Sequence, residues 1–155
     1  AYSNYPGGLQ PIVMAEPYIN INSIMADLGS GNGLQGLLFQ KLYPHQSTYQ
    51  VELSGDLIDT GKILQAALEI DEDKIVWVND DILNFPLDQL DFLYLFRPSR
   101  PFGDGVKTYH ILRDKLKAHN KPLTVFSIAD CLTDFVDDRF STFYDDGHLT
   151  CFQKA

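Results

Sequence analysis

The feature that most constrains this 155-residue chain is a glycine-rich heptapeptide from Asp27 to Gly33, with the sequence DLGSGNG. It follows the short apolar run 24–28 and precedes residues 34–43, in which apolar side chains recur at helical spacing. A buried strand that ends in glycines and continues into a helix is typical of a parallel α/β sheet. Glycine permits positive φ angles and lets a ligand approach the backbone closely. The heptapeptide therefore predicts an α/β sheet with a ligand site at the carboxyl end of its first strand.

The rest of the chain continues to alternate strands with helices. A strand following each helix implies right-handed crossovers and a parallel sheet. Near the carboxyl end the pattern changes, because 139–144 and 148–152 flank an Asp-Asp-Gly turn, which indicates an antiparallel hairpin. The predicted helices are 34–43, 56–68 and 106–119, and the predicted strands before the hairpin are 24–28, 48–53, 74–78, 92–96 and 123–128.

Two features of the predicted helices and of the amino-terminal segment are less regular. In the second helix Ile58, Ile63, Leu64, Ala67 and Leu68 are expected to share one face, and Gly61 is expected to weaken that helix by about 1 kcal/mol relative to Ala. Residues 1–20 contain several prolines and glycines, which favour a lead-in strap with at most one short helical turn. The length is that of one domain covering residues 1–155.

Charge and hydropathy exclude several classes of partner. The chain has 21 acidic and 12 basic residues, for a formal net charge of −9, and such a surface repels a phosphate backbone. Nucleic acid is therefore disfavoured as a partner. No run of about 18 apolar residues and no signal-peptide pattern is present, which predicts a cytoplasmic protein with no membrane partner. The densest basic stretch is interpreted as the solvated face of a helix: Arg113, Lys115, Lys117 and Lys121.

Two classes of cofactor compete for the glycine loop, besides the simple reading of an ordinary glycine-rich turn. Gly31, Gly33 and Gly36 satisfy the dinucleotide pattern GxGxxG, and Glu52 stands near the distance expected for a ribose-binding acid. However, a pyrophosphate would share the loop with the carboxylate of Asp27, and no Lys or Arg precedes Lys41 to offset that repulsion. A cationic ligand suits an acidic loop better than a phosphate does.

The loop resembles motif I of the class I S-adenosylmethionine-dependent methyltransferases, in which an acid stands two positions before alternating glycines. Asp27, Gly29, Gly31 and Gly33 match that pattern. The resemblance covers residues from about 24 to the end, including the terminal hairpin. It implies a Rossmann-like, mostly parallel sheet of about seven strands in the order 3-2-1-4-5-7-6, with helices on both faces. It also implies the cofactor S-adenosyl-L-methionine, with S-adenosyl-L-homocysteine as the product.

The same resemblance assigns cofactor contacts to single positions after the first three strands. The loop backbone, including Ser30, would lie under the methionine half of the cofactor, with Asp27 near its amino group. Glu52, followed by Leu53, occupies the place of the acid that binds both ribose hydroxyls, and a carboxylate can accept both hydrogen bonds. Asp81, followed by Ile82, matches the acid near the adenine amino group, although Asp80 is one residue away. The alternatives are a solvated surface acid at the strand end for Glu52 and a helix-cap or turn acid for Asp81 or Asp80.

Substrate contacts are expected from the segment after the fourth strand. It lacks an NPPY-type motif, which disfavours methylation of adenine or glutamine nitrogens. Tyr94, Arg97 and Arg100 are the candidate substrate-binding residues, since two arginines in a proline-stiffened loop can clamp a carboxylate or phosphate. Ion pairs with the chain's own acids are the alternative. Both the short lead-in and residues 130–138 leave the site open, which favours a substrate bound partly by residues 1–20, a homo-oligomer that completes the site, or a domain without catalysis.

No catalytic base is assigned, because methyl transfer needs mainly the alignment of nucleophile, methyl group and sulfur. The histidines are scattered and are expected to be structural or solvated, and the acidic cluster at 71–73 is expected to be a solvated turn, so no metal is predicted. Cys131 and Cys151 lack metal-type spacing and are expected to be free, buried thiols. The sequence thus predicts a methyltransferase acting on a small molecule or a protein. A non-catalytic binding or interaction module and an NAD-dependent oxidoreductase are the alternatives.

Overall fold

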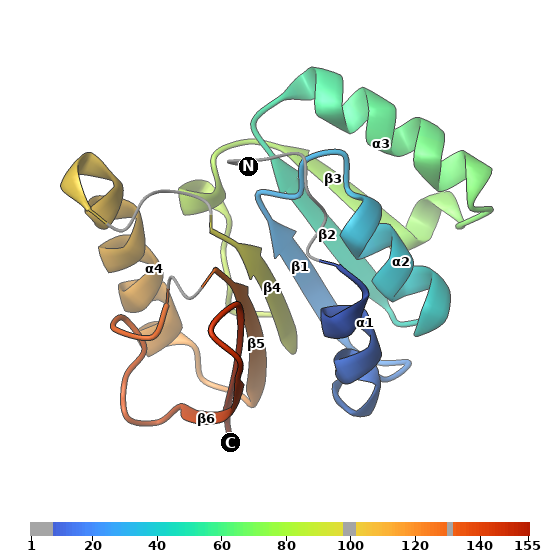
Figure 1. Cartoon of the computed structure of the whole chain (residues 1–155). Coiled ribbons are helices and arrows are strands. Elements are labelled where there is room, and N and C mark those ends of the chain that lie inside the picture. Colours follow the sequence, from blue (N-terminus) through green and yellow to red (C-terminus); the bar gives the residue numbers. More distant parts are fainter. Residues whose placement is uncertain (1–7, 98–101, 130–131) are drawn as a thin grey trace.

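The computed structural model describes residues 8–97, 102–129 and 132–155 and is built around one seven-stranded sheet (Figure 1). The strands are hydrogen-bonded in the order β3-β2-β1-β4-β5-β7-β6, as predicted. Five parallel strands are followed by an antiparallel hairpin at one edge. Their bounds are β1 Ile24–Leu28, β2 Ser47–Glu52, β3 Ile75–Asn79, β4 Phe92–Phe96, β5 Leu123–Ile128, β6 Ser141–Asp145 and β7 Leu149–Lys154.

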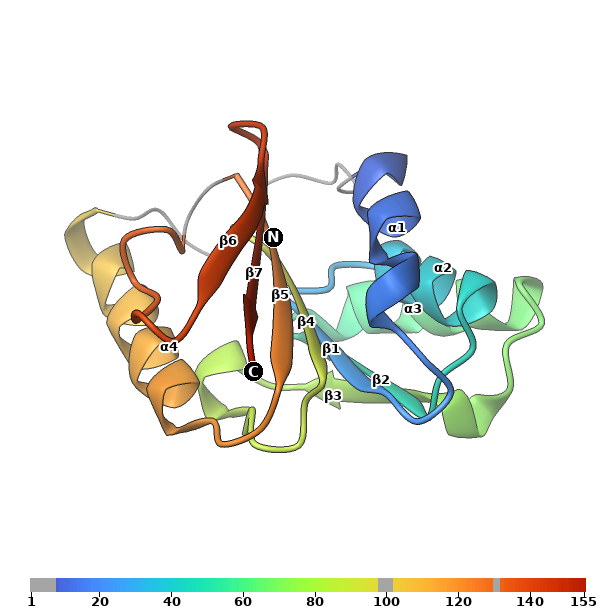
Figure 2. The same ribbon diagram turned by 90° about the horizontal axis from the view of Figure 1, so that it is seen from below.

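The helices cover the two faces of the sheet unequally (Figure 2). Three α-helices lie on one face: α1 (Leu9–Ala15), α2 (Leu34–Leu42) and α3 (Gly55–Ala67). The other face carries α4 (Val106–Ala118), and the segment containing Leu132 and Phe140 packs into the same apolar cluster. Short 3-10 turns complete the chain: η1 Glu16–Tyr18, η2 Glu72–Lys74, η3 Ile82–Asn84 and η4 Gly103–Gly105.

Each face of the sheet has its own apolar core, because successive side chains of a strand point to opposite sides. Under α1 and α2 the cluster is rich in aromatic rings, including Phe39, Phe92 and Phe126. Under α4 it is mainly aliphatic and includes Leu93, Leu112 and Val125. The burial of β4 and β5 explains why β4 is an unbroken apolar run and β5 is mainly apolar, and both strands were predicted with correct bounds.

The amino-terminal segment differs from the predicted strap with at most one short turn. Residues 9–15 form a seven-residue helix, and η1 follows it directly. Pro11 is compatible with this helix because it lies in the first turn, where backbone N–H groups have no intrahelical acceptor. Ile12 and Ala15 are buried against the sheet, so tertiary packing stabilises a helix that is too short to form alone.

The buried face of α3 also differs from the predicted one. Ile63 is 71% exposed, whereas Gly61 is buried and faces Trp77 of β3. A Cβ atom at position 61 would overlap the Trp77 ring and would lie 2.5 Å from the backbone oxygen of Asn32 in the glycine loop. The glycine therefore lets α3 approach both the edge strand and the loop, and its packing role outweighs its low helix propensity.

Gly61→Ala is accordingly expected to destabilise the protein by about 1–3 kcal/mol, although helix propensity alone predicts a gain of about 1 kcal/mol. Chemical denaturation measures the difference. Gly55→Ala is the matched control in the same helix, because a Cβ atom there meets only Asn79 Oδ1 at an ordinary 3.7 Å. A Gly61→Ala variant as stable as Gly55→Ala would show that the Trp77 contact is not tight.

Two further predictions concern thiols and membranes. Cys151 is a free, buried cysteine, as expected, and burial raises the pKa of its thiol to about 12. Cys131 lies outside the described residues. Within the described ranges no helix is both long and apolar enough to cross a membrane.

Candidate functional site at the carboxyl edge of the sheet

The glycine loop between β1 and α2 has the conformation for which alternating glycines are needed. Gly29, Gly31 and Gly33 have φ angles of 75°, 58° and 79°, in the region that side chains with a Cβ atom avoid. The loop is tied to β2, since the N–H groups of Gly29 and Ser30 both donate to the Val51 carbonyl oxygen, at 2.9 and 3.0 Å. A Cβ atom at Gly29 or Gly31 would meet open space, so these glycines leave room above the loop.

The base of the loop is held by Gln50 of β2, a residue that the sequence did not single out. Its Nε2 donates to the Gly33 carbonyl oxygen at 2.8 Å. Gly36, in the first turn of α2, has no room for a Cβ atom because the Gln50 side chain fills that space. Gly36 thus serves close packing of helix against sheet, the role that the third glycine of a GxGxxG pattern has, so this packing does not distinguish the two cofactor classes.

Glu52, at the end of β2, accepts hydrogen bonds from both sides of its carboxylate. Gly31 N donates to Oε1 and Ser54 N donates to Oε2, each at 2.9 Å. The side chain is 5% exposed, so it is a fixed part of the loop and not a solvated surface acid. Each carboxylate oxygen has a second lone pair, so two further hydrogen bonds from ligand hydroxyls remain feasible.

Asp27 is the most unusual group of the site. Asp27 is 2% exposed, and none of the described residues forms a hydrogen bond or ion pair with its carboxylate. Burial, reinforced by the negative charge of Glu52, raises the pKa of Asp27 from 3.8 to about 7. A buried carboxylate without a partner is costly, and such groups are concentrated at functional sites.

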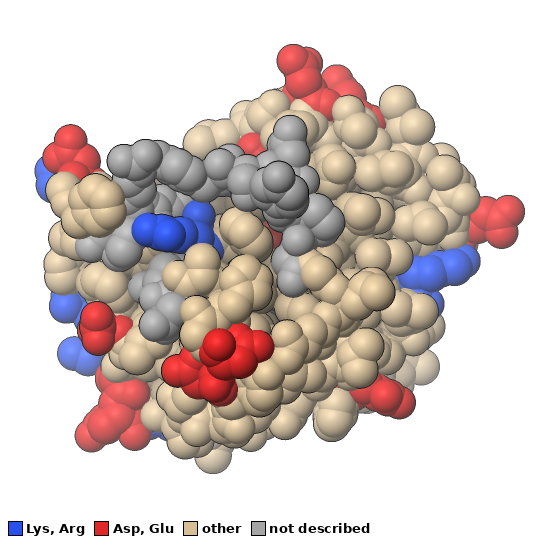
Figure 3. All heavy atoms as spheres, viewed as in Figure 1, with Lys and Arg blue, Asp and Glu red and all other residues tan. Residues whose placement is uncertain are grey.

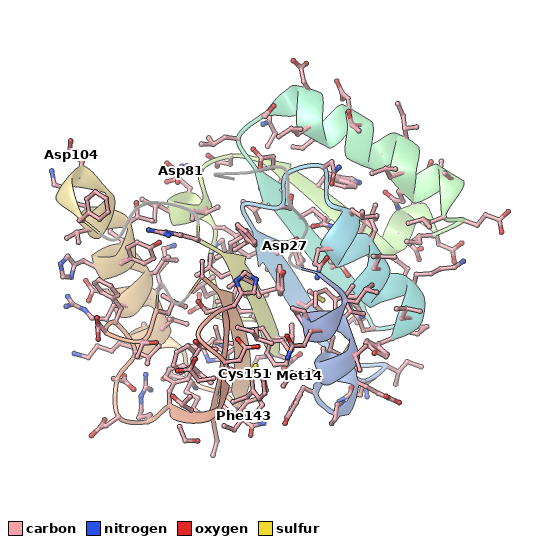
Figure 4. All side chains as sticks on the ribbon, viewed as in Figure 1. Met14, Asp27, Asp81, Asp104, Phe143 and Cys151 are labelled. Carbon is pink, nitrogen blue, oxygen red and sulfur yellow. The ribbon has the colours of Figure 1, made fainter. Side chains whose placement is uncertain are left out.

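Asp81 caps the turn after β3, because its Oδ1 accepts a hydrogen bond from Leu83 N at 2.9 Å. Asp80 belongs to the same turn, where its Oδ1 accepts hydrogen bonds from Asp81 N and Asn84 Nδ2, and the Asn84 bond is the main reason that the pKa of Asp80 is lowered. Ile82 packs against the core under α4, whereas Leu53 is 68% exposed. Asp27 and Asp81 both lie toward the upper edge of the sheet as drawn, where the strands end (Figure 4).

The candidate substrate-binding residues have different environments. Tyr94 is 1% exposed and pairs in register with Asp27 on the neighbouring strand. Arg97 follows β4, is partly exposed, and makes no ion pair with a described residue, so the alternative of a structural salt bridge gains no support there. Arg100 lies outside the described residues.

Among the described residues, the histidines and acidic side chains form no metal centre. His45 and His119 are fully buried, and both are bound to backbone carbonyl oxygens, Tyr43 O at 2.6 Å and Leu90 O at 2.9 Å. His110 and His148 are exposed. Within residues 8–97, 102–129 and 132–155, no three His, Cys, Asp or Glu side chains are grouped so that they could hold a metal ion.

The basic stretch of α4 and the loop after it is partly structural, in contrast to the predicted solvated face. Lys115 donates to the Phe85 carbonyl oxygen at 2.9 Å, and Lys121 pairs with Asp91 at 3.0 Å. On the face shown in Figure 3, Lys and Arg form small separate groups, and acidic side chains gather over the β6–β7 turn, which contains Asp145 and Asp146.

Sequence reasoning missed three polar side chains that hold the site together. Besides Gln50, Asn79 at the end of β3 donates to the carbonyl oxygens of Glu52 and Leu53, at 3.1 and 2.9 Å. Gln35 of α2 donates to the Gly8 carbonyl oxygen at 2.8 Å. A polar residue in an otherwise apolar strand was a usable signal for Gln50. The other two depend on contacts between distant segments.

Comparison with known proteins identifies the architecture. An RNA methyltransferase from Salinibacter ruber in complex with S-adenosyl-L-homocysteine superposes with a TM-score of 0.72 at 17% identity, over 98% of this chain and 92% of that one. The chain has the class I methyltransferase fold. A putative methyltransferase from Escherichia coli gives a TM-score of 0.73 at 15% identity, over 98% of this chain and 89% of that one.

A third match, a putative methyltransferase from Streptococcus mutans in complex with SAH, has a TM-score of 0.69 at 11% identity and covers 99% of this chain and all of that one. No protein-family model and no curated protein matches the sequence. At these identities the likeness to methyltransferases establishes the fold. Because RNA and rRNA methyltransferases are among the matched structures, the acidic charge alone does not exclude nucleic acid.

Proposed function

We propose that this protein is an S-adenosylmethionine-dependent methyltransferase whose cofactor binds at the carboxyl edge of β1, β2 and β3. The observation that carries the proposal is the Asp27 carboxylate, buried and without a partner among the described residues, beside a glycine loop in a class I methyltransferase fold. A cationic ligand is the natural partner for such a carboxylate. The methionine half of S-adenosylmethionine carries a sulfonium and an ammonium group.

The donor set fits this cofactor better than a dinucleotide. Asp27 and Glu52 both carry carboxylates at the loop, and the negative charge of Glu52 is one cause of the raised pKa of Asp27. A pyrophosphate would add further negative charge at this place, which costs free energy in a buried site. The packing of Gly36 on Gln50 is common to both cofactor classes and favours neither. The NAD-dependent alternative therefore has no support beyond the motif itself.

The chain's own residues would act chiefly by alignment. When bound, the cofactor supplies a methyl group activated by the sulfonium. Asp27 would balance the charge of the methionine half, Glu52 would orient the ribose, and Asp81 with Ile82 would border the adenine. The positive-φ loop would let the cofactor lie against the backbone. No general base is required of this site, since orientation accounts for most of the catalysis of methyl transfer.

We further propose a small molecule or a protein side chain as the methyl acceptor. The net charge of −9 opposes the approach of a polyanion. Arg97, exposed in part and without an ion pair among the described residues, is available to a substrate anion. The matched RNA and rRNA methyltransferases make RNA the acceptor to test against this expectation.

Transfer of a labelled methyl group tests the function. The protein is incubated with methyl-labelled S-adenosylmethionine and with three separate fractions of a cell extract, namely small molecules, protein and RNA. We expect label in the small-molecule or protein fraction. Label in RNA alone would keep the methyltransferase and reject the proposed acceptor class. Cofactor binding without label in any fraction would support the non-catalytic binding module.

A further inference from the structure

The hydroxyl group of Tyr94, on β4, belongs to the residue that is paired with Asp27 across the sheet, and the proposed function gives it no role. Asp27 and Tyr94 are register partners on neighbouring parallel strands, so their side chains leave the same face of the sheet. Tyr94 is 1% exposed, and its hydroxyl oxygen is buried without a hydrogen-bond partner in the described structure. A second buried hydroxyl without a partner, that of Ser30, belongs to the glycine loop itself.

The surroundings of the Tyr94 ring call for an aromatic side chain. Gln35 of α2 is near enough to the hydroxyl to oppose the rise in the pKa of Tyr94, but the two side chains do not meet in hydrogen-bond geometry. The ring meets Phe39 at 5.3 Å in an edge contact and belongs to the apolar cluster that includes Phe92 and Phe126. Phenylalanine would satisfy this packing and would leave no buried polar atom unpaired. An unsatisfied polar atom in a well-packed core calls for an explanation in function.

We propose that Tyr94 and Asp27 together bind the ammonium group of the cofactor's methionine moiety, an inference that rests on the proposed function. Burial and the charge of Asp27 raise the pKa of Tyr94, so its hydroxyl stays protonated across the physiological range. A neutral phenol can donate its proton to the Asp27 carboxylate and accept a hydrogen bond from an ammonium N–H at the same time. The pair presents one charge and one dipole to the ligand.

Tyr94 is thus assigned to cofactor binding, although the sequence pattern had placed it among the residues that contact the methyl acceptor. A side chain that is 1% exposed and lies in the core beneath α2 is poorly placed to meet an incoming substrate. Arg97, three residues later and partly exposed, remains at the surface where a substrate arrives. Tyr94 of β4 is thus assigned to the cofactor, and Arg97, just after β4, is assigned to the methyl acceptor.

The test compares two ligands by isothermal titration: S-adenosylhomocysteine and its deaminated analogue, which lacks only the ammonium group. Tyr94→Phe is expected to weaken S-adenosylhomocysteine about 10- to 100-fold, the range for a hydrogen bond to a charged group, and to leave the analogue unaffected. Tyr49→Phe, which removes a hydroxyl from the opposite face of the sheet, should change neither affinity. The melting temperature of unliganded Tyr94→Phe should equal or exceed that of the wild type.

Three results would overturn the inference. These are an unchanged affinity of Tyr94→Phe for S-adenosylhomocysteine, an equal loss for both ligands, and a large drop in the melting temperature of the unliganded variant. The second and third would make the hydroxyl structural. Failure of the wild type to bind S-adenosylhomocysteine would instead reject the proposed function, and it is distinguished from the other results because no variant is needed to see it.

Discussion

Replacing Asp27 by Asn is expected to stabilise the unliganded protein at pH 8 and to remove most of its affinity for S-adenosylhomocysteine. The folded-state pKa of Asp27 is raised from 3.8 to about 7, so folding favours the protonated form. Stability is therefore lost as pH rises from the unfolded to the folded pKa, and the full penalty applies above pH 7. Each pH unit between the two pKa values costs about 1.4 kcal/mol, which makes the penalty on the order of 4 kcal/mol.

Because a buried Asn amide without partners keeps part of that cost, the expected gain in the free energy of unfolding is about 1–3 kcal/mol. Affinity for S-adenosylhomocysteine should fall by about 30- to 1,000-fold, as for other buried charge pairs. In the wild type the affinity should rise between pH 6 and pH 8 as Asp27 ionises, and in Asp27→Asn it should be flat. Asp59→Asn, with the same charge change on the exposed surface of α3, is the control.

These opposite effects on stability and binding distinguish a functional acid from a structural one. Replacing a structural carboxylate would lower the stability of the protein. Replacing a carboxylate that is kept for a ligand raises it. Chemical denaturation of Asp27→Asn and Asp59→Asn at pH 8 measures the change in stability. Titration with S-adenosylhomocysteine at three pH values measures the change in affinity. If Asp27→Asn were less stable than the wild type and bound the ligand normally, Asp27 would have a structural role only.

Glu52→Gln is expected to weaken both the loop and the binding of the ribose. The amide keeps one oxygen for Gly31 N or Ser54 N but presents its NH₂ group to the other, so one of two backbone N–H groups loses its acceptor. We expect a loss of about 1–3 kcal/mol in the free energy of unfolding and a 10- to 100-fold loss of affinity for S-adenosylhomocysteine. Glu72→Gln, at an exposed position before β3, should change neither.

The same variant also probes the coupling between the two acids. Since the charge of Glu52 contributes to the raised pKa of Asp27, its removal should lower that pKa. The pH dependence of binding should then move to lower pH in Glu52→Gln. A variant with wild-type stability, affinity and pH dependence would show that the Glu52 carboxylate is dispensable to the loop and to the ligand.

The sequence predicted the sheet well because its signals are local. β1, β4 and β5 are buried and mainly apolar, and the runs of β1 and β4 are followed closely by a glycine and a proline. Motif I was predictable for the same reason, since positive φ angles at Gly29, Gly31 and Gly33 demand glycine whatever the rest of the chain does. The hairpin was predictable from the Asp-Asp-Gly turn between two short strands.

Features that depend on contacts between distant segments could not be read in this way. Helix α1 exists because Ile12 and Ala15 are buried against the sheet, despite Pro11. The buried face of α3 is set by Trp77, twelve or more residues away, so Ile63 was wrongly predicted to be buried and the packing role of Gly61 was missed. The pairing of Asp27 with Tyr94 depends on strand register, which no local pattern specifies.

The most direct test of the S-adenosylmethionine site is the thermal shift of the wild-type protein with saturating S-adenosylhomocysteine, compared with saturating NAD. A ligand at about 100 times its Kd adds roughly 2.7 kcal/mol to the stability of the folded state. The Asp27 site predicts a clear rise in melting temperature with S-adenosylhomocysteine and none with NAD. A rise with NAD alone, or with neither ligand, would contradict it.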